Sequence, residues 1–298
     1  MTRIAVIGLG AMGGGMARAC LKAGLKTHGF DMDRGRVEAF QDEGGAPGEV
    51  DAVAGDLDLV ATVVVNAAQT EAALFGEGGI APKLKRGATI LSCATMAPAE
   101  AKALDAKAEA LDLHYLDAPV SGGTLRAAGG DLSFLASGPA AAFEAAKPAL
   151  DAMGREVFAL GDEVGKGSAM KAVNQVLVGV HIAAMAEAMT FGMTQGVSPE
   201  ESLRIISQCA GTSWAFENRG PHVVEGDYTP LSAVDIWLKD LGIVMDIARS
   251  AKFSAPLTAA ALQQFVAASG SGLGREDDAA VAKVYARNAG LTLPGEGA

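Results

Sequence analysis

A glycine-rich turn near the start of the chain is the feature that most constrains its fold. An apolar run, Arg3–Ile7, leads into Gly8-Leu9-Gly10-Ala11-Met12-Gly13, and a segment rich in small residues follows. This order predicts a strand, a tight turn at Gly8, and a helix that packs closely on the strand through Gly13. Gly10 lets the backbone approach a pyrophosphate, whose charge the helix N-terminus favours. The turn predicts a dinucleotide site; because the chain holds 38 glycines, a purely structural turn is the alternative.

Asp31 ends a second strand-like run, Lys26–Asp31, and bears on the choice of cofactor. A carboxylate in this place accepts hydrogen bonds from the ribose hydroxyls of NAD and repels the additional phosphate of NADP. The sequence therefore predicts NAD, bound by the turn residues Gly8, Leu9, Gly10, Ala11, Met12 and Gly13 together with Asp31. In the alternative, Asp31 only caps the turn that follows. Arg34 lies close by and is expected to soften the preference for NAD.

Composition bounds the class of protein. Half of the 298 residues are hydrophobic, which is enough for one or two buried cores. The formal net charge of −11 argues against nucleic acid and anionic membrane surfaces as partners, and it requires local cations or backbone N–H groups to hold an anionic substrate. The longest apolar stretch, residues 176–193, is interrupted by His181 and Glu187, so no membrane span is expected.

Cysteine and histidine placement points to a reducing compartment. Three widely spaced cysteines, Cys20, Cys93 and Cys209, do not form the pattern of a disulfide framework. Four scattered histidines lack the spacing of a zinc site, so no metal is predicted. The chain also enters its first strand without a basic segment and cleavage site. We expect a soluble, cytoplasmic protein.

Strand and helix patterns divide the chain into two parts. Apolar runs at 59–65, 88–92, 113–117, 132–136 and 156–160 predict that the first two strands are continued by a mostly parallel sheet. Beyond residue 161 these runs give way to helical patterns, beginning with one long helix, Gly167–Gln195, and a capping box at Ser198 and Glu201. The prediction is a doubly wound α/β Rossmann domain, residues 1–161, joined by the long helix to an all-α domain, residues 162–298.

Four segments in a fixed order carry a family resemblance. They are the glycine turn, Asp117–Gly123, Gly165–Gln175 and Lys239–Gly242. The chain resembles the β-hydroxyacid dehydrogenase family, which includes 3-hydroxyisobutyrate dehydrogenase and tartronate semialdehyde reductase. The resemblance covers nearly the whole chain. It implies an oxidoreductase that moves a hydride between a nicotinamide cofactor and a small hydroxy acid.

A narrower resemblance lies within this family. Val65–Gln69, Gly179–Ala184 and Ser213–Ile236 are similar to the L-threonate dehydrogenase branch. It implies NAD-dependent oxidation of the C2 hydroxyl of L-threonate to 2-dehydro-L-erythronate. 3-Hydroxyisobutyrate and glycerate are alternative substrates within the family. A silent cofactor-fold binding protein and the reductive-aminase relatives are further alternatives, and the lysine at position 171 argues against both.

Lys171 and its neighbours predict the chemistry. Lys171, Asn174 and Gln175 lie at i, i+3 and i+4, so one helix face presents an amine beside amide groups. Burial near a second cation, Lys239, disfavours the ammonium form, as a general base requires. Spacing alone also fits a solvated lysine and, for Asn174, a helix-interface amide. The resemblance implies that Lys171 is the general base and that Asn174 orients the substrate hydroxyl or the lysine, while Gln175 stands where many family members have asparagine.

Ser121, Gly122 and Gly123 follow a predicted strand end, where open α/β sheets bind ligands. Two glycines free the backbone N–H groups to hold a carboxylate, which is the role the resemblance also implies. An ordinary strand-to-helix turn is the alternative.

The resemblance implies three more contacts. Lys239 reaches the cofactor and substrate from the helical domain, with Asp240 holding it in place, although spacing alone fits surface charges. Asn66 and Thr95 touch the nicotinamide ribose. Relatives pair through apolar faces of the helical domain, so a homodimer or homotetramer is expected.

Overall fold

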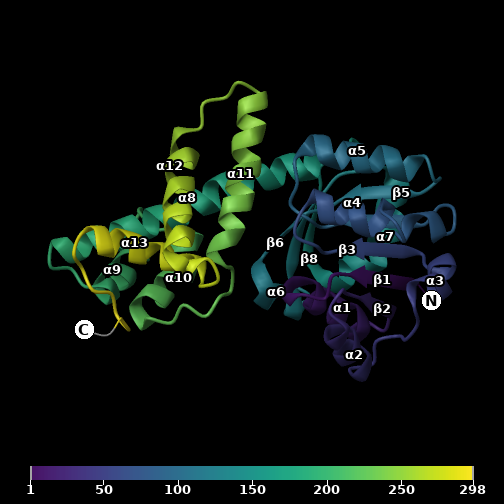
Figure 1. The fold of residues 1–298 in the computed structure, drawn as a ribbon, viewed down its shortest axis with the longest axis horizontal. Helices are drawn as coiled ribbons and strands as arrows, with labels where there is room; N and C mark the ends of the chain where they lie inside the picture. Colours follow the sequence, from purple (N-terminus) through teal and green to yellow (C-terminus); the bar gives the residue numbers. More distant parts are fainter. Residues whose placement is uncertain (1, 297–298) are drawn as a thin grey trace. The chain divides into compact units, whose positions relative to one another are not determined.

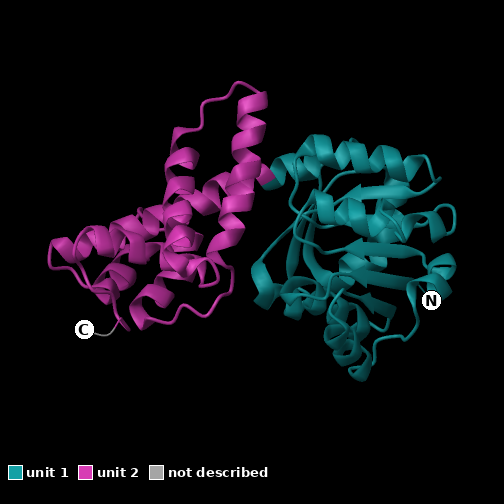
Figure 2. Ribbon diagram, in the orientation of Figure 1, with its two compact units in different colours: residues 1–171 teal, residues 172–298 magenta. Residues whose placement is uncertain are grey.

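A computed structural model describes residues 2–296 of the chain (Figure 1). The chain divides into two compact units, residues 1–171 and residues 172–298 (Figure 2). The first unit holds both sheets, and the second is helical. The division falls inside the long helix α8 (Lys166–Thr194), whereas the sequence places the domain boundary just before that helix.

A parallel five-stranded sheet organises the first unit, as the sequence predicts. The strands lie in the order β2-β1-β3-β4-β5, so the order reverses at β1. The strands are β1 (Arg3–Ile7), β2 (Lys26–Phe30), β3 (Leu59–Thr62), β4 (Thr89–Ser92) and β5 (His114–Asp117). The helices that precede α8 are α1 (Ala11–Lys22), α2 (Arg34–Asp42), α3 (Val50–Val53), α4 (Ala67–Phe75), α5 (Pro98–Glu109), α6 (Gly123–Gly129) and α7 (Ala140–Met153).

Alternate residues of this sheet enter two separate hydrophobic cores. Ile4 and Val6 of β1 pack in one cluster, whereas Ala5 between them packs in the other, together with Val60 of β3. Every residue of β3 and β4 is buried. Burial on both faces explains why these strands read as continuous apolar runs, and it places helices on both sides of the sheet (Figure 1).

A second sheet corrects one expectation from the sequence. Its strands, in the order β6-β7-β8, are β6 (Val120–Ser121), β7 (Leu132–Ala136) and β8 (Gly154–Ala159). The segments predicted to continue the main sheet, 132–136 and 156–160, lie in this second sheet instead. Asp117 exchanges two backbone hydrogen bonds with Ser137, and Gly122, with φ of 137°, turns the chain so that β6 pairs antiparallel with β7. An apolar run predicts a strand but not its partner, which these turns decide.

The second unit is built from helices, as predicted. After α8 they are α9 (Pro199–Ile206), α10 (Trp214–Glu225), α11 (Val234–Ser250), α12 (Pro256–Ala268) and α13 (Val281–Asn288). The predicted capping box is confirmed: Glu201 N–H donates to Ser198 Oγ at 3.2 Å, and Ser198 N–H donates to the Glu201 carboxylate at 3.0 Å. Satisfying these end groups fixes where α9 begins.

Helix α8 is long and apolar enough to cross a membrane by length and composition. Its Ile182, Met185 and Met189 side chains are buried in the core of the helical unit. A helix that supplies the centre of a globular core meets the same criteria as a membrane span. Helix α8 is therefore a core helix, although Val173 and Phe191 on its other faces are exposed.

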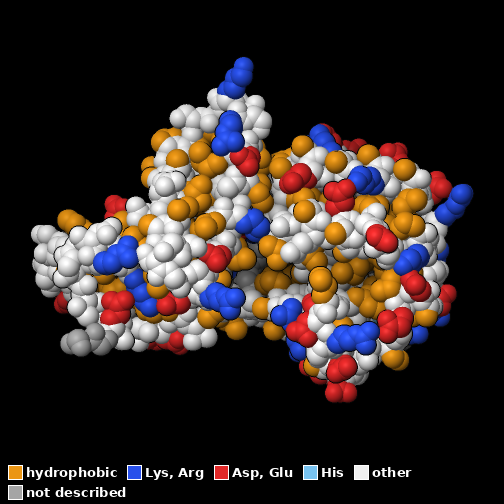
Figure 3. All heavy atoms as spheres, viewed as in Figure 1, with side chains coloured by type: hydrophobic (Ala, Val, Ile, Leu, Met, Phe, Trp, Pro, Cys, Tyr) orange, Lys and Arg blue, Asp and Glu red, His pale blue; other side chains and the backbone are white. Residues whose placement is uncertain are grey.

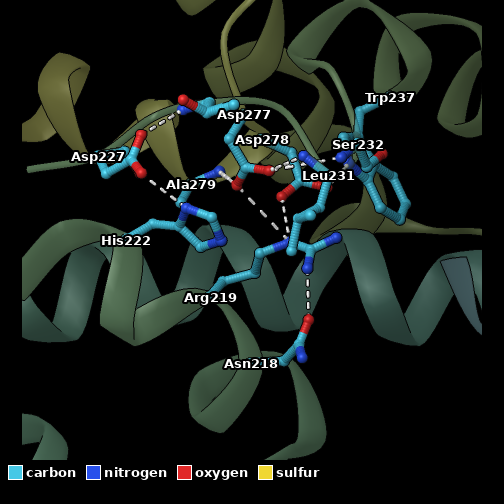
Figure 4. Close-up of polar contacts among 11 residues, drawn as sticks. Asn218, Arg219, His222, Asp227, Leu231, Ser232, Trp237, Asp277, Asp278 and Ala279 are labelled. Carbon is cyan, nitrogen blue, oxygen red and sulfur yellow. Dashed lines mark hydrogen bonds and ion pairs between the residues drawn. The ribbon is translucent and has the colours of Figure 1, made fainter. Parts of the chain in front are cut away.

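A buried charged cluster ties the segment 274–280 to α10 and α11 (Figure 4). Arg219 Nε donates to Asp278 Oδ1 at 2.6 Å, and Trp237 Nε1 donates to Asp278 Oδ2 at 2.8 Å. Asp277, also buried, accepts backbone N–H groups from the loop before α11. Burial raises the pKa of Asp278 to about 6, with Arg219 opposing the rise and the Asp277 charge adding to it. The segment 274–280 thus has a structural role, joining α10 and α11 through its two aspartates.

Candidate functional site

The predicted site segments of the first unit begin at one edge of the main sheet. The register aligns the last residues of the five strands in a row: Phe30, Ile7, Thr62, Ser92 and Asp117. The cofactor turn, Asp31, Asn66, Thr95 and the Ser121–Gly123 segment each follow one of these ends. In open α/β sheets this carboxyl edge, at the reversal of strand order, is where ligands bind.

The glycine turn has the geometry that a dinucleotide needs. Gly8 has φ of 92°, and its N–H donates to Phe30 O at 2.8 Å. A Cβ at Gly13 would lie 1.8 Å from Gly8 O, so only glycine allows this approach of helix to strand. Gly10 precedes α1, and no side chain of residues 2–296 caps that helix end. The backbone N–H groups there fit a pyrophosphate.

Asp31 is fixed beside this turn by hydrogen bonds. Leu9 N–H donates to Asp31 Oδ2 at 2.7 Å, and Asp33 N–H donates to Asp31 Oδ1 at 2.9 Å, so the carboxylate does cap the following turn. Burial alone raises the pKa of Asp31, but these backbone bonds and the Arg36 guanidinium 3.5 Å away lower it overall. The cation paired with Asp31 is therefore Arg36 rather than Arg34, which the sequence singles out.

Asn66 and Thr95 lie after β3 and β4 and are partly buried. Asn66 Oδ1 accepts a hydrogen bond from Gln69 N–H at 2.9 Å and so caps α4. This contact gives Asn66 a structural role of its own. Contact of either residue with a cofactor stays a prediction.

The Ser121–Gly123 segment combines a strand end with two residues of positive φ. Ser121 ends β6, Gly122 has φ of 137°, and Gly123 has φ of 75°. A Cβ at Gly122 would meet Arg126 Cδ at 2.9 Å. Apart from its chain neighbours and the backbone of its own helix, no heavy atom of residues 2–296 lies within 4 Å of a Cβ built at Gly123, so that side of the turn faces open space. Its backbone is thus accessible at the start of α6.

Asp117 joins the end of β5 to the start of α8, a link that the sequence does not reveal. Its carboxylate accepts bonds from Gly165 N–H at 3.1 Å, Ser168 N–H at 2.8 Å and Ser168 Oγ at 2.7 Å. Burial raises the pKa of Asp117, and these donors oppose the rise. Lys171 lies one turn beyond Ser168 with its surface 8% exposed, which excludes a solvated helix lysine.

A chain of polar contacts joins α8 and α11 within the helical unit. Asn174 Nδ2 donates to Gln175 Oε1 at 2.9 Å, and Gln175 Nε2 donates to Asp240 Oδ2 at 2.5 Å. Lys239 Nζ lies 2.7 Å from Asp240 Oδ1. The Asp240 side chain is 4% exposed, so this ion pair is not a surface pair. Asp240 therefore holds Lys239, and Gln175 contacts Asp240.

Charge on the molecular surface is mixed. On the face drawn in Figure 3, Lys and Arg side chains are interspersed with Asp and Glu on both units. That face has no continuous basic area for a polyanion.

Comparisons with known protein families match most of both units. The profile described as the NAD binding domain of 6-phosphogluconate dehydrogenase matches residues 3–161. The profile described as NAD-binding of NADP-dependent 3-hydroxyisobutyrate dehydrogenase matches residues 165–285. The first unit is therefore a domain that binds NAD or NADP.

Individual relatives share the full length of the chain. L-Threonate dehydrogenase of Cupriavidus necator is 49% identical over 98% of both chains. NAD-dependent L-serine dehydrogenase of Pseudomonas aeruginosa is 34% identical over 96% of this chain and 98% of the relative. A crystal structure described as 3-hydroxyisobutyrate dehydrogenase from Salmonella typhimurium is 44% identical, with a TM-score of 0.89 over 95% of this chain and 100% of that one. The named substrates differ, whereas fold and length agree.

Proposed function

The chain belongs to the β-hydroxyacid dehydrogenase family, and we propose that it oxidises the C2 hydroxyl of L-threonate with NAD. The reaction converts L-threonate and NAD⁺ into 2-dehydro-L-erythronate, NADH and a proton. The observation that carries the choice of substrate is the 49% identity with an L-threonate dehydrogenase over 98% of both chains. The general chemistry, oxidation of a CH–OH group, is that of the family.

The proposed cofactor is NAD, held by the turn Gly8–Gly13 and by Asp31. The uncapped N-terminus of α1 suits the pyrophosphate, and an ionised Asp31 suits the ribose hydroxyls and repels a 2′-phosphate. Asn66 and Thr95 follow the next two strands of the sheet and are assigned to the nicotinamide ribose. The bound nicotinamide supplies the hydride acceptor.

The proposed base is Lys171. Its burial on α8 disfavours the charged amine, and the neutral amine takes the proton of the substrate hydroxyl as the C–H bond is broken. Asn174 on the same helix orients that hydroxyl. The backbone N–H groups of Ser121, Gly122 and Gly123 hold the carboxylate, and Lys239 supplies the local cation that a chain of net charge −11 needs.

We also assign the enzyme to the cytoplasm, as a homodimer or homotetramer. The argument for assembly is apolar exposure on α8: Val173, Leu177 and Phe191 are 57%, 53% and 65% exposed. Exposed apolar side chains along a core helix favour burial against another subunit.

A panel of C3 and C4 hydroxy acids tests the proposal. L-Threonate, D-threonate, 3-hydroxyisobutyrate, glycerate and L-serine are each supplied with NAD and with NADP, and NADH or NADPH formation gives kcat/KM. We expect L-threonate with NAD to give the highest value and a 2-oxo acid as product. The second candidate is 3-hydroxyisobutyrate, favoured by the 44% identical structure; a higher kcat/KM for that acid would replace L-threonate.

A further inference from the structure

We propose that Gln175 is a positioning residue that couples the carboxamide of Asn174 to the ammonium of Lys239 through Asp240. The inference rests on the proposed function, in which Asn174 orients the substrate hydroxyl and Lys239 pairs with the substrate. Gln175 itself contacts neither substrate nor cofactor in this assignment.

The contacts set the direction of each amide. Gln175 Nε2 donates a hydrogen bond to Asp240 Oδ2 at 2.5 Å. The Oε1 atom of Gln175 therefore faces Asn174 and accepts a hydrogen bond from its Nδ2 at 2.9 Å. One of the two N–H donors of Asn174 Nδ2 is thereby used by Gln175, which fixes the plane of the carboxamide. The second N–H and the oxygen Oδ1 are the groups that Asn174 offers to a substrate hydroxyl.

The same donation fixes Lys239. Asp240 uses Oδ2 for Gln175 and Oδ1 for Lys239, which lies 2.7 Å away. The hydrogen bond from Gln175 holds the plane of the carboxylate, and this places Oδ1 beside Lys239, whose ammonium it attracts as an ion pair without a directional hydrogen bond. Without the Gln175 donor, the carboxylate can turn and Lys239 can follow it.

Burial and packing make this coupling rigid. Gln175 is 5% exposed and Asp240 is 3% exposed, so water cannot readily replace a lost partner. One turn further along α8, Gly179 lets α11 approach: a Cβ there would lie 2.8 Å from Leu241 Cδ2 and 3.0 Å from the Trp237 ring. This close approach of the helices lets a side chain as long as glutamine span the gap.

The test compares Gln175→Met, which keeps the length but has no amide, with Gln175→Glu. The matched control is Thr190→Val, because Thr190 is also buried on α8 and, within residues 2–296, its hydroxyl donates to carbonyls of its own helix, Ala186 at 2.8 Å and Glu187 at 3.1 Å. Each enzyme is assayed on whichever panel acid the wild type oxidises best, so failure of L-threonate as substrate leaves the comparison intact. Gln175→Met should lower kcat/KM about tenfold or more and leave the Kd for NADH within about twofold. Thr190→Val should keep wild-type kcat/KM.

The Gln175→Glu variant distinguishes a positioning role from a loss of stability, because its effect on kcat/KM should depend on pH. A glutamate anion repels the Asp240 carboxylate and cannot donate to it, whereas a protonated glutamic acid donates to Asp240 and accepts from Asn174 as glutamine does. Its kcat/KM relative to wild type should therefore recover as the pH falls, and that of Gln175→Met should not. Independently of activity, a crystal structure of Gln175→Met should show the Lys239–Asp240 distance beyond about 4 Å. Wild-type kcat/KM in Gln175→Met, a pH-independent ratio for Gln175→Glu, or an unchanged ion pair would overturn the proposal.

Discussion

The hydroxyl of Ser168 donates to Asp117 Oδ1 at 2.7 Å while its backbone N–H donates to Oδ2 at 2.8 Å. This double contact sets the first turn of α8 on the carboxyl end of β5. Lys171 lies on the next turn of that helix, and the chain leaving β5 reaches Ser121 by way of β6. The Asp117 carboxylate thus fixes where two segments begin. One is the helix that carries the proposed base, and the other is the chain that leads to Ser121–Gly123, the proposed site of the substrate carboxylate.

Replacing Asp117 should therefore cost stability. Asp117→Asn substitutes an N–H₂ group for one acceptor oxygen and leaves a buried donor unpaired, so the free energy of unfolding should fall by about 1–3 kcal/mol. Urea denaturation measures it. Glu163→Gln is the control, because within residues 2–296 that exposed carboxylate pairs with lysines near the same helix start, and its loss should cost clearly less than the loss of Asp117. Equal losses in the two variants would refute the anchoring role.

Cofactor choice should depend on Asp31. Asp31→Ser removes the negative charge and releases Arg36, so the ratio of kcat/KM with NADP to that with NAD should rise about tenfold or more. Asp33→Ser is the matched control, since Asp33 lies 3.4 Å from the same arginine without contacting Leu9 N–H. An unchanged ratio in Asp31→Ser would place the discrimination elsewhere.

A side chain at Gly123 should block the substrate carboxylate. Gly123→Val should raise KM for L-threonate or abolish turnover and leave NADH binding intact, because a Cβ there enters open space rather than the protein. Gly87→Val controls for backbone strain, since Gly87 has φ of 77°, close to the 75° of Gly123, and an equally open surrounding among residues 2–296. Normal L-threonate kinetics in Gly123→Val would move the carboxylate to another site.

Asp278 should make stability depend on pH. Its folded pKa of about 6 exceeds the reference value of 3.8, so its ionisation lowers the free energy of unfolding as the pH rises between these values. Asp278→Asn does not titrate at this position. The stability of the variant relative to wild type should therefore increase from about pH 4 to about pH 7. Urea denaturation at both pH values measures this difference, and a constant difference would contradict a raised pKa.

Local sequence patterns predicted the local structure well. The turn at Gly8, the close packing at Gly13, the long helix and the capping box at Ser198 each depend on residues a few positions apart. Periodicity and end signals report on such neighbours directly. The same patterns also predicted that the site segments follow strand ends.

Contacts between distant residues could not be predicted in this way. Asp117 and Ser168 are separated by 51 positions, and Gln175 and Asp240 by 65. Nothing in either residue's own neighbourhood marks its partner, just as no apolar run marked the separate sheet containing β7 and β8. Arg36 rather than Arg34 pairs with Asp31, because the geometry of the first turn of α2 determines which of the two side chains is directed toward Asp31.

The role of Lys171 as the general base is tested by steady-state oxidation of L-threonate with the Lys171→Met enzyme. The control is Lys166→Met, since Lys166 is the first residue of the same helix and its side chain is 51% exposed. NADH formation gives kcat, and NADH fluorescence titration gives cofactor affinity. Removing the general base should lower kcat about a hundredfold or more in Lys171→Met, with the Kd for NADH nearly unchanged and Lys166→Met close to wild type. A Lys171→Met enzyme that keeps most of its turnover would contradict the assignment of the base.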